Sequence, residues 1–209
     1  RQRQMCIRDR VNTIKPYGRW EKICGKGRIL PAFPGAGGCI EGGILDAQLL
    51  PRAIQPTTFG EIGGRKSSRE EALAYIFRKS HIPYQIVPEM HHWQISHLGV
   101  IIPLADAYYQ SRHPEKICAN EKLMTLTAYR MKKNLKWIAQ KGMLCPAKLY
   151  MIKDMPTGML AGVLSRVYQS EFGNRFLYRH AMHAPEEFQR LHQEFYNYMK
   201  THTKESNKT

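Results

Sequence analysis

The feature that most constrains the fold of this chain is a change of sequence pattern near residue 88. Before it, short apolar and β-branched stretches alternate with glycine and proline, which is typical of strands joined by turns. After it, apolar residues recur at helical spacing, as from Met124 to Ile138. The pattern therefore predicts a mixed α/β part over residues 11–87, an all-helical part over residues 88–200 and a polar tail over residues 201–209.

Local signals add the elements expected within these parts. Ser68 and Glu71 have the spacing of a helix capping box, so a helix is expected to follow Ser68. In the second part, a further helix is expected from Phe188 to Met199. In the first part, the expected elements are a short buried strand over residues 28–34, a glycine-rich turn over 35–43, and strands over 44–50, 52–62 and 84–88.

The chain is strongly basic, with a formal net charge of +15, of which residues 1–10 contribute +3 through four Arg and one Asp. Such a charge suits a polyanionic partner such as nucleic acid. The basic residues are spread along the chain, however, without zinc-finger spacing or an aromatic ribonucleoprotein motif, which is typical of a solvated lysine-rich surface. We therefore expect no nucleic-acid partner.

Apolar stretches and cysteines indicate the compartment. No apolar run is long enough to cross a bilayer, so no membrane partner is expected. The cysteines after residue 10 are widely spaced and form no CxxC pair, which favours reduced thiols. These features predict a soluble cytoplasmic protein.

Residues 1–10, RQRQMCIRDR, do not have the pattern of a secretory signal, because no apolar stretch follows their charges. They resemble the translation of a sequencing adapter joined to a transposase end sequence. We therefore exclude them from the fold. The native chain is expected to begin near Val11, with further coding sequence upstream of it.

Two glycine-rich segments approach phosphate-binding motifs without completing them. Gly35 and Gly37 begin a dinucleotide fingerprint, G-x-G-x-x-G, but Ile40 stands at the position of its third glycine. A phosphate loop needs a glycine before its lysine, and Arg65 stands there before Lys66. Turns between strands explain each segment when it is taken alone.

His180, His183 and Glu187 would share one face of a helix if the segment that holds them were helical. Such a face can hold a metal ion. Because no second cluster of ligands accompanies it, hydrogen-bonded histidines are the commoner outcome, and we predict no metal site.

Four stretches of the chain carry a family resemblance: AFPGAGGCIEGG, QPTTFGEIGG, HHWQISHLGVIIPLADAYY and RHAMHAPEEFQRLHQEF. Taken in order, they resemble a divergent branch of the ketopantoate reductase (2-dehydropantoate 2-reductase) family. The resemblance runs from about Gly27 to Tyr198 and keeps the order of the family's two domains.

This resemblance implies a C-terminal remnant of a Rossmann-like dinucleotide-binding domain, followed by a helical domain like that of 6-phosphogluconate dehydrogenase. The family uses NADPH, and its phosphate-binding glycines lie at the start of the first domain. In an N-terminally truncated chain they would lie upstream of Val11. By position, the resemblance implies that Pro34, Gly35, Gly37 and Gly38 lie beside the nicotinamide end of NADPH.

The family reduces the ketone of a 2-oxo acid, with a Lys two residues after a Trp as general acid and Asn residues four and eight positions later. Trp93 matches the Trp, but Ile95, Gly99 and Pro103 stand at the other three positions. Hydride addition leaves a developing alkoxide, which needs a proton donor or a cation. A reshaped site is therefore expected.

We expect His97 or His180 to be the proton donor, with Asp106 and Glu187 as polar partners. His97 follows Trp93 by four residues, so the two should share one helix face. The predicted function is NADPH-dependent reduction of a 2-oxo acid or related carbonyl by the full-length protein, with the present chain inactive by itself. The alternative is a non-catalytic relative that binds a nucleotide or a partner, and a homodimer is a possible assembly.

Overall fold

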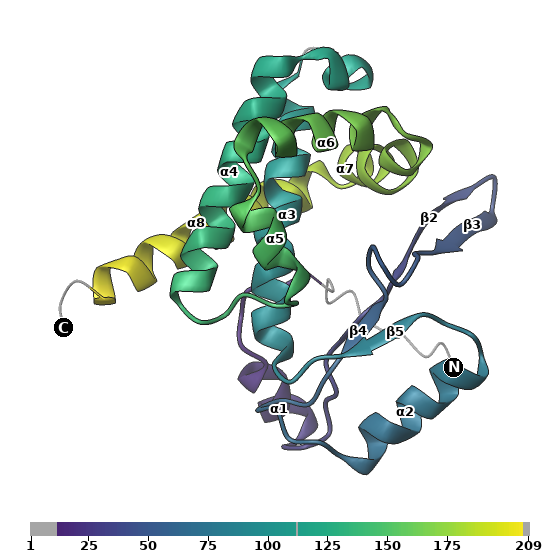
Figure 1. Ribbon diagram of the computed structural model, residues 1–209. Helices are drawn as coiled ribbons and strands as arrows, with labels where there is room; N and C mark the ends of the chain where they lie inside the picture. Colours follow the sequence, from purple (N-terminus) through teal and green to yellow (C-terminus); the bar gives the residue numbers. More distant parts are fainter. Residues whose placement is uncertain (1–11, 112, 207–209) are drawn as a thin grey trace.

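The computed structural model describes residues 12–111 and 113–206, and it has a mixed α/β part followed by a mostly helical part (Figure 1). The predicted change near residue 88 is confirmed, because strand β5 (Tyr84–Ile86) is followed directly by the long helix α3 (Met90–Gln110). The interpretation of residues 1–10 lies outside the described residues.

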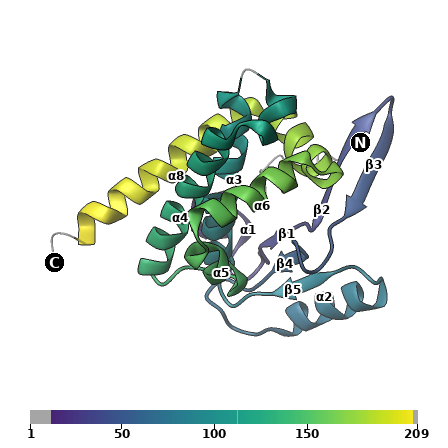
Figure 2. The same ribbon diagram turned by 45° about the horizontal axis from the view of Figure 1, so that its top comes forward.

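A small three-stranded sheet lies at the centre of the first part (Figure 2). Strand β1 (Ala32–Phe33) pairs antiparallel with β4 (Thr57–Phe59), and β4 pairs parallel with β5. A parallel pair needs a crossover between its strands, and helix α2 (Ser68–Lys79) supplies it. The ring of Phe77 on α2 lies 5.6 Å from that of Phe59, which is completely buried, so the helix packs on the sheet.

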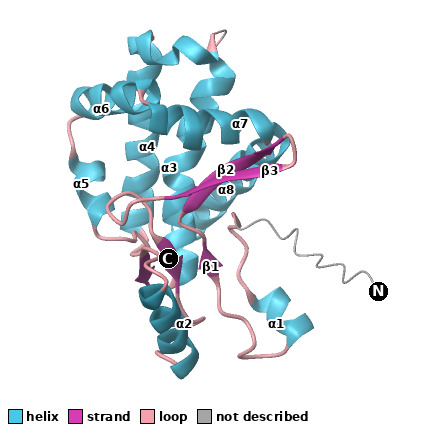
Figure 3. Ribbon diagram, turned by 90° about the vertical axis from the view of Figure 1, so that its right-hand side faces the viewer, coloured by secondary structure: helices cyan, strands magenta, loops and turns pink. Residues whose placement is uncertain are grey.

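A separate β-hairpin consists of β2 (Ala36–Glu41) and β3 (Ile44–Leu49), as Figure 3 shows. Gly42 and Gly43 form its two-residue turn, with φ of +57° and +79°, which glycine adopts without strain. The prediction of a turn over residues 35–43 was wrong for most of that range. Pairing with β3 holds residues 36–41 in an extended conformation.

Two further local predictions are corrected. The strand expected over residues 28–34 is limited to β1, whose residue Ala32 is exposed. The cap of α2 is Ser67, which is extended and accepts a hydrogen bond of 3.2 Å from the Glu70 N–H, and Ser68 is already helical. Both serines have a glutamate three residues later, so the backbone conformation decides which one caps the helix.

Helices make up the second part of the chain. The helices predicted within residues 124–138 and 188–199 are confirmed as parts of α4 (Glu121–Gln140) and α8 (Pro185–Ser206). Helix α8 continues into the expected tail. No helix among the described residues is long and apolar enough to span a bilayer. The remaining helices of the described residues are α1 (Gly18–Cys24), η1 (Pro114–Ala119), α5 (Lys148–Asp154), α6 (Thr157–Gln169), the π-helix η2 (Gly173–Tyr178) and α7 (Arg179–His183).

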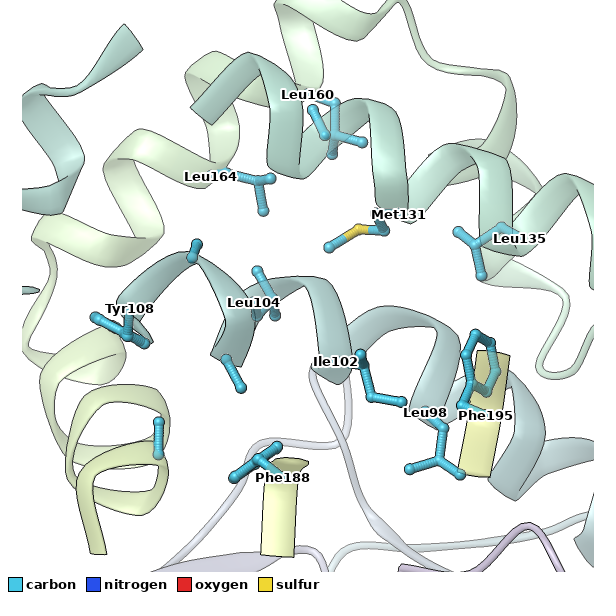
Figure 4. Packing of buried hydrophobic residues seen from close by; sticks show 14 of the residues in the cluster. Leu98, Ile102, Leu104, Tyr108, Met131, Leu135, Leu160, Leu164, Phe188 and Phe195 are labelled. Carbon is cyan, nitrogen blue, oxygen red and sulfur yellow. The ribbon is translucent and has the colours of Figure 1, made fainter. Parts of the chain in front are cut away.

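Helix α3 contributes to both hydrophobic clusters of the described chain. Its first turn belongs to the smaller cluster, in which Met90 and Trp93 pack with Tyr17 and Val87. The rest of α3 belongs to the larger cluster with α4, α6 and α8, where Phe195 is completely buried (Figure 4). A helix that is apolar on all sides needs such cover from several elements.

The middle of α3 holds a break in the helical hydrogen bonds. Pro103 has no N–H and cannot donate to the Gly99 carbonyl, which is four residues earlier. The side-chain amide of Asn134 on α4 donates to this carbonyl instead, at 3.2 Å. Gly99 permits the close approach of α4, since a Cβ there would lie 2.7 Å from Cδ1 of Ile138. The three residues Gly99, Pro103 and Asn134 therefore form one structural unit.

Asn134→Ala is expected to lower the free energy of unfolding by about 1–3 kcal/mol, because it leaves the buried Gly99 carbonyl without a donor. In the Pro103→Ala background the loss should be smaller, since that substitution restores a backbone N–H four residues after Gly99. Urea denaturation of the four chains in this double-mutant cycle measures the difference. Equal losses in both backgrounds would contradict the role assigned to Asn134.

Candidate functional site

The junction between the sheet and α3 brings one of the predicted catalytic residues close to the segment that was predicted to bind the cofactor. The ring of His97 stacks on Trp93 with a centroid distance of 5.0 Å and an interplanar angle of 8°, and it lies 4.6 Å from the ring of Phe33. The prediction that His97 shares the Trp93 face of α3 is therefore confirmed. Phe33 directly precedes Pro34, so the segment expected beside a cofactor begins next to His97.

Burial lowers the pKa of both histidines at this junction. Burial and, to a lesser degree, the nearby His180 lower the pKa of His97 to about 3. His97 is therefore neutral at pH 7, where its ring can donate one N–H hydrogen bond. Desolvation also lowers the pKa of His180, but the carboxylate of Glu187 opposes that shift. Of the two, His180 is the better suited to carry a proton.

His180, His183 and Glu187 would share one face only in a continuous helix, and the segment that holds them is not one. Helix α7 ends at His183, Ala184 has φ −132° and ψ 47°, and α8 begins at Pro185. A residue before proline is pushed out of the helical region by the proline ring, which explains the break. Within residues 12–111 and 113–206, no group of three or more His, Cys, Asp or Glu side chains is placed to hold a metal ion.

The predicted cofactor residues lie at the start of β2, where glycine permits close packing. A Cβ on Gly35 would lie 2.3 Å from the backbone that leads into β4, and a Cβ on Gly37 would lie 2.3 Å from the ring of Phe176 in η2. The hairpin therefore contacts the helical part at Gly37. Pro34 and Gly38 are exposed, so this stretch of backbone is accessible beside the junction.

The segment from Gly60 to Lys66 does connect a strand to a helix, as a phosphate loop would. Its own carboxylate, however, lies at the start of α2: Glu61 accepts hydrogen bonds from the hydroxyl of the Ser67 cap and from the Arg69 guanidinium. These bonds, that with Arg69 above all, hold the pKa of Glu61 below its usual range, so Glu61 is ionised at pH 7. An internal anion thus takes the position that a phosphate would need.

The positions that match the family's Lys and Asn residues lie in the interior. Ile95 is 0% exposed, and Gly99 and Pro103 are also buried. Gly99 faces Asn134 and Ile138 of α4, as described above. These three positions therefore serve packing and present no polar side chain to a ligand.

Asp106 is separate from the junction, near the C-terminal end of α3. Its carboxylate oxygens lie 2.9 and 3.0 Å from Nδ1 of His192 on α8. Burial raises the pKa of Asp106, while His192 and Arg130 act in the opposite direction. The structure therefore groups His97, His180 and Glu187, and it gives Asp106 a different partner from the one predicted.

Asp106 and His192 line a groove of about 810 Å³ between α4 and the helices α3 and α8. The sequence interpretation did not identify His192 or the groove residues of α4. His192 lies one helical turn after the buried Phe188 and one turn before Tyr196. A polar residue in line with an apolar stripe was the sequence pattern that could have indicated a role for His192.

Comparison of the chain with protein-family models, with curated proteins and with solved structures finds no match. No relative therefore supplies a function, a ligand or a catalytic residue for this chain. A function has to rest on the junction around His97 and on the groove around Asp106, together with the sequence resemblance described above.

The lowered pKa of His97 predicts a pH-dependent stability. Between about pH 6.5 and pH 3 the unfolded chain binds a proton on His97 that the folded chain does not, so the free energy of unfolding falls as the pH falls through this range. Urea denaturation at pH 7 and pH 5 should show this loss, and His97→Phe should remove part of it. His113→Phe, at an exposed histidine, is the matched control, and in it the part of the loss that comes from His97 should remain. A ring resonance of His97 that titrates near pH 6.5 would contradict the assignment.

Proposed function

We propose that this chain is the carbonyl-binding part of an NADPH-dependent reductase of the ketopantoate reductase-like class, which reduces the ketone of a 2-oxo acid or a related carbonyl. The observation that carries the proposal is the meeting of Phe33 and His97 beside His180 at the junction. The backbone that follows Phe33 is the stretch that the family resemblance assigns to the nicotinamide end of NADPH. A hydride donor and a proton donor would thus approach one carbonyl from adjoining segments.

The order of elements supports the same proposal. Strands β4 and β5 and the crossover helix α2 form a parallel unit typical of nucleotide-binding α/β domains. A long buried helix and a helical part follow it. This is the order expected for the end of a Rossmann-like domain joined to a helical domain like that of 6-phosphogluconate dehydrogenase.

In the proposed chemistry, one histidine transfers a proton to the substrate and the other donates a hydrogen bond to it. His180 is the proton donor: burial lowers its pKa and the Glu187 carboxylate opposes that shift, and the protonated form gives its proton to the carbonyl oxygen as negative charge develops there and becomes neutral. His97 is neutral throughout and donates an N–H hydrogen bond to the same oxygen, a role in which a neutral imidazole stabilises a developing oxyanion. NADPH, when bound, supplies the hydride.

The described residues fit one end of this cofactor only. The exposed backbone at Pro34 and Gly38 can contact a nicotinamide ring. Neither glycine-rich segment can hold the phosphates, because one forms the hairpin strand β2 and the other is closed by Glu61. In the proposed reductase, the phosphates are held by residues outside the described ranges.

Substrate binding is tested on this chain through Trp93, which contacts His97. Ketopantoate or 2-oxoisovalerate should quench its fluorescence saturably, and Trp93→Phe should abolish that signal. His180→Asn should raise the Kd about tenfold, since it removes a charge-assisted hydrogen bond to the ligand. His183→Asn, on the same helix, is the matched control and should leave the Kd unchanged. Absence of saturable quenching would contradict the proposed site.

Turnover is tested by NADPH oxidation with the same 2-oxo acids, using the chain extended by any residues that its gene encodes before Val11. His180→Asn should lower kcat by about 100-fold or more, the usual loss when a proton donor is removed. Full turnover in both His180→Asn and His97→Leu would show that neither histidine takes part.

A non-catalytic relative that binds a nucleotide or a partner is the second candidate. The burial of Ile95 favours it, because the family's general acid would have to stand at this position. Saturable binding of a 2-oxo acid without NADPH oxidation by the extended chain would favour this candidate over the reductase.

A further inference from the structure

The groove between α4 and α8 carries chemistry that the proposed reductase does not use. Its volume of about 810 Å³ is in the range of small-molecule sites. The cationic side chains of Arg130, Lys133 and Lys200 line it, against the single carboxylate of Asp106. Asp106 is engaged by His192 at 2.9 Å. The groove therefore has an excess of positive charge.

Arg130 is the groove cation that acts on Asp106. It lies close enough to Asp106 to oppose the rise in the pKa of that carboxyl, yet its guanidinium makes no hydrogen bond or ion pair with another described residue. A guanidinium presents paired N–H donors that match the two oxygens of a carboxylate or phosphate. An anion in the groove would supply the partner that the described part of the protein does not.

Aromatic rings form the other component of the groove. Tyr129, Trp137 and Tyr196 line it, and Tyr129 is 56% exposed. The indole N–H of Trp137 donates to the Thr203 hydroxyl at 2.9 Å, and the Tyr196 hydroxyl accepts from Asn134 at 3.4 Å. These bonds orient two of the rings before any ligand arrives, and aromatic faces favour contact with a flat ligand ring.

We propose that this groove binds a small aromatic anion, that is, a flat ring bearing a phosphate or carboxylate group. The charged group lies against Arg130 and Lys133, and the ring lies against Trp137 and Tyr196. This site is separate from the junction around His97, and it does not depend on the proposed reductase function.

A second copy of the chain is a poorer occupant. A twofold interface would place the same surface against itself, so that Arg130, Lys133 and Lys200 of one copy would face those of the other. Like charges brought together in this way oppose association. An anionic ligand neutralises the same charges and fits the volume.

The test uses phenyl phosphate as the probe and the fluorescence of Trp137 as the signal. Phenyl phosphate should quench saturably with a Kd on the order of 1 mM, as expected for a ligand of this size. Inorganic phosphate and phenol, which each keep one half of the probe, should bind at least about tenfold more weakly, because each loses one set of contacts. Trp137→Phe should abolish the signal, whereas Trp93→Phe should not.

Two variants of α4 distinguish binding at a specific site from attraction by the general surface charge. Arg130→Gln should raise the Kd of phenyl phosphate about tenfold, since it removes a charge-assisted pair of hydrogen bonds. Lys136→Gln removes the same charge from an exposed residue of the same helix that does not line the groove. It should leave the Kd within about twofold, because isolated surface charges contribute little.

Three results would overturn the proposal. They are an absence of saturable quenching, an equal loss of affinity in Arg130→Gln and Lys136→Gln, and binding of inorganic phosphate as tight as that of phenyl phosphate. Calorimetric titration of each variant, with its urea denaturation curve, distinguishes a lost site from a lost fold. Because the junction is followed through Trp93, failure here leaves the test of the reductase unaffected.

Discussion

Helix α3 carries apolar side chains on every face, and such a helix is stable in water only when other elements cover all of it. The cluster around Trp93 covers its first turn, and α4, α8, η1 and η2 cover the rest. Phe33 and Tyr17 extend that cover to the first part of the chain, where the Tyr17 hydroxyl donates to Gln94 at 2.6 Å. The burial of one helix thereby fixes the sheet part to the helical part.

The same helix supports both candidate sites. His97 and Asp106 are nine residues apart on α3, which corresponds to about 13 Å along the helix axis. The junction around His97 joins α3 to β1 and α7, whereas the groove around Asp106 joins α3 to α4 and α8. Because close packing holds α3 rigid, the distance between the two sites is fixed. Each site can therefore bind a ligand of its own.

Helical periodicity predicted α4 and α8 correctly because the apolar stripe of a helix is a local pattern. The hairpin was missed because glycine-rich residues such as Gly37 and Gly38 favour turns locally, and only pairing with β3 makes them a strand. The Asp106–His192 pair joins residues 86 positions apart, so no spacing in the sequence could reveal it. In contrast, helix geometry alone predicts that His97 and Trp93, four residues apart, lie on one face of α3.

Native-state hydrogen exchange of α3 tests the central claim that this helix joins the two parts. We predict that the amides from Gln94 to Leu98, and those from Ile102 to Tyr108 other than Pro103, exchange only through global unfolding, at the same free energy as the interior of α4. The β2–β3 hairpin should exchange earlier by local opening. Early exchange of Gln94 to Leu98 together with the hairpin would contradict the claim, because α3 would then belong to the helical part alone.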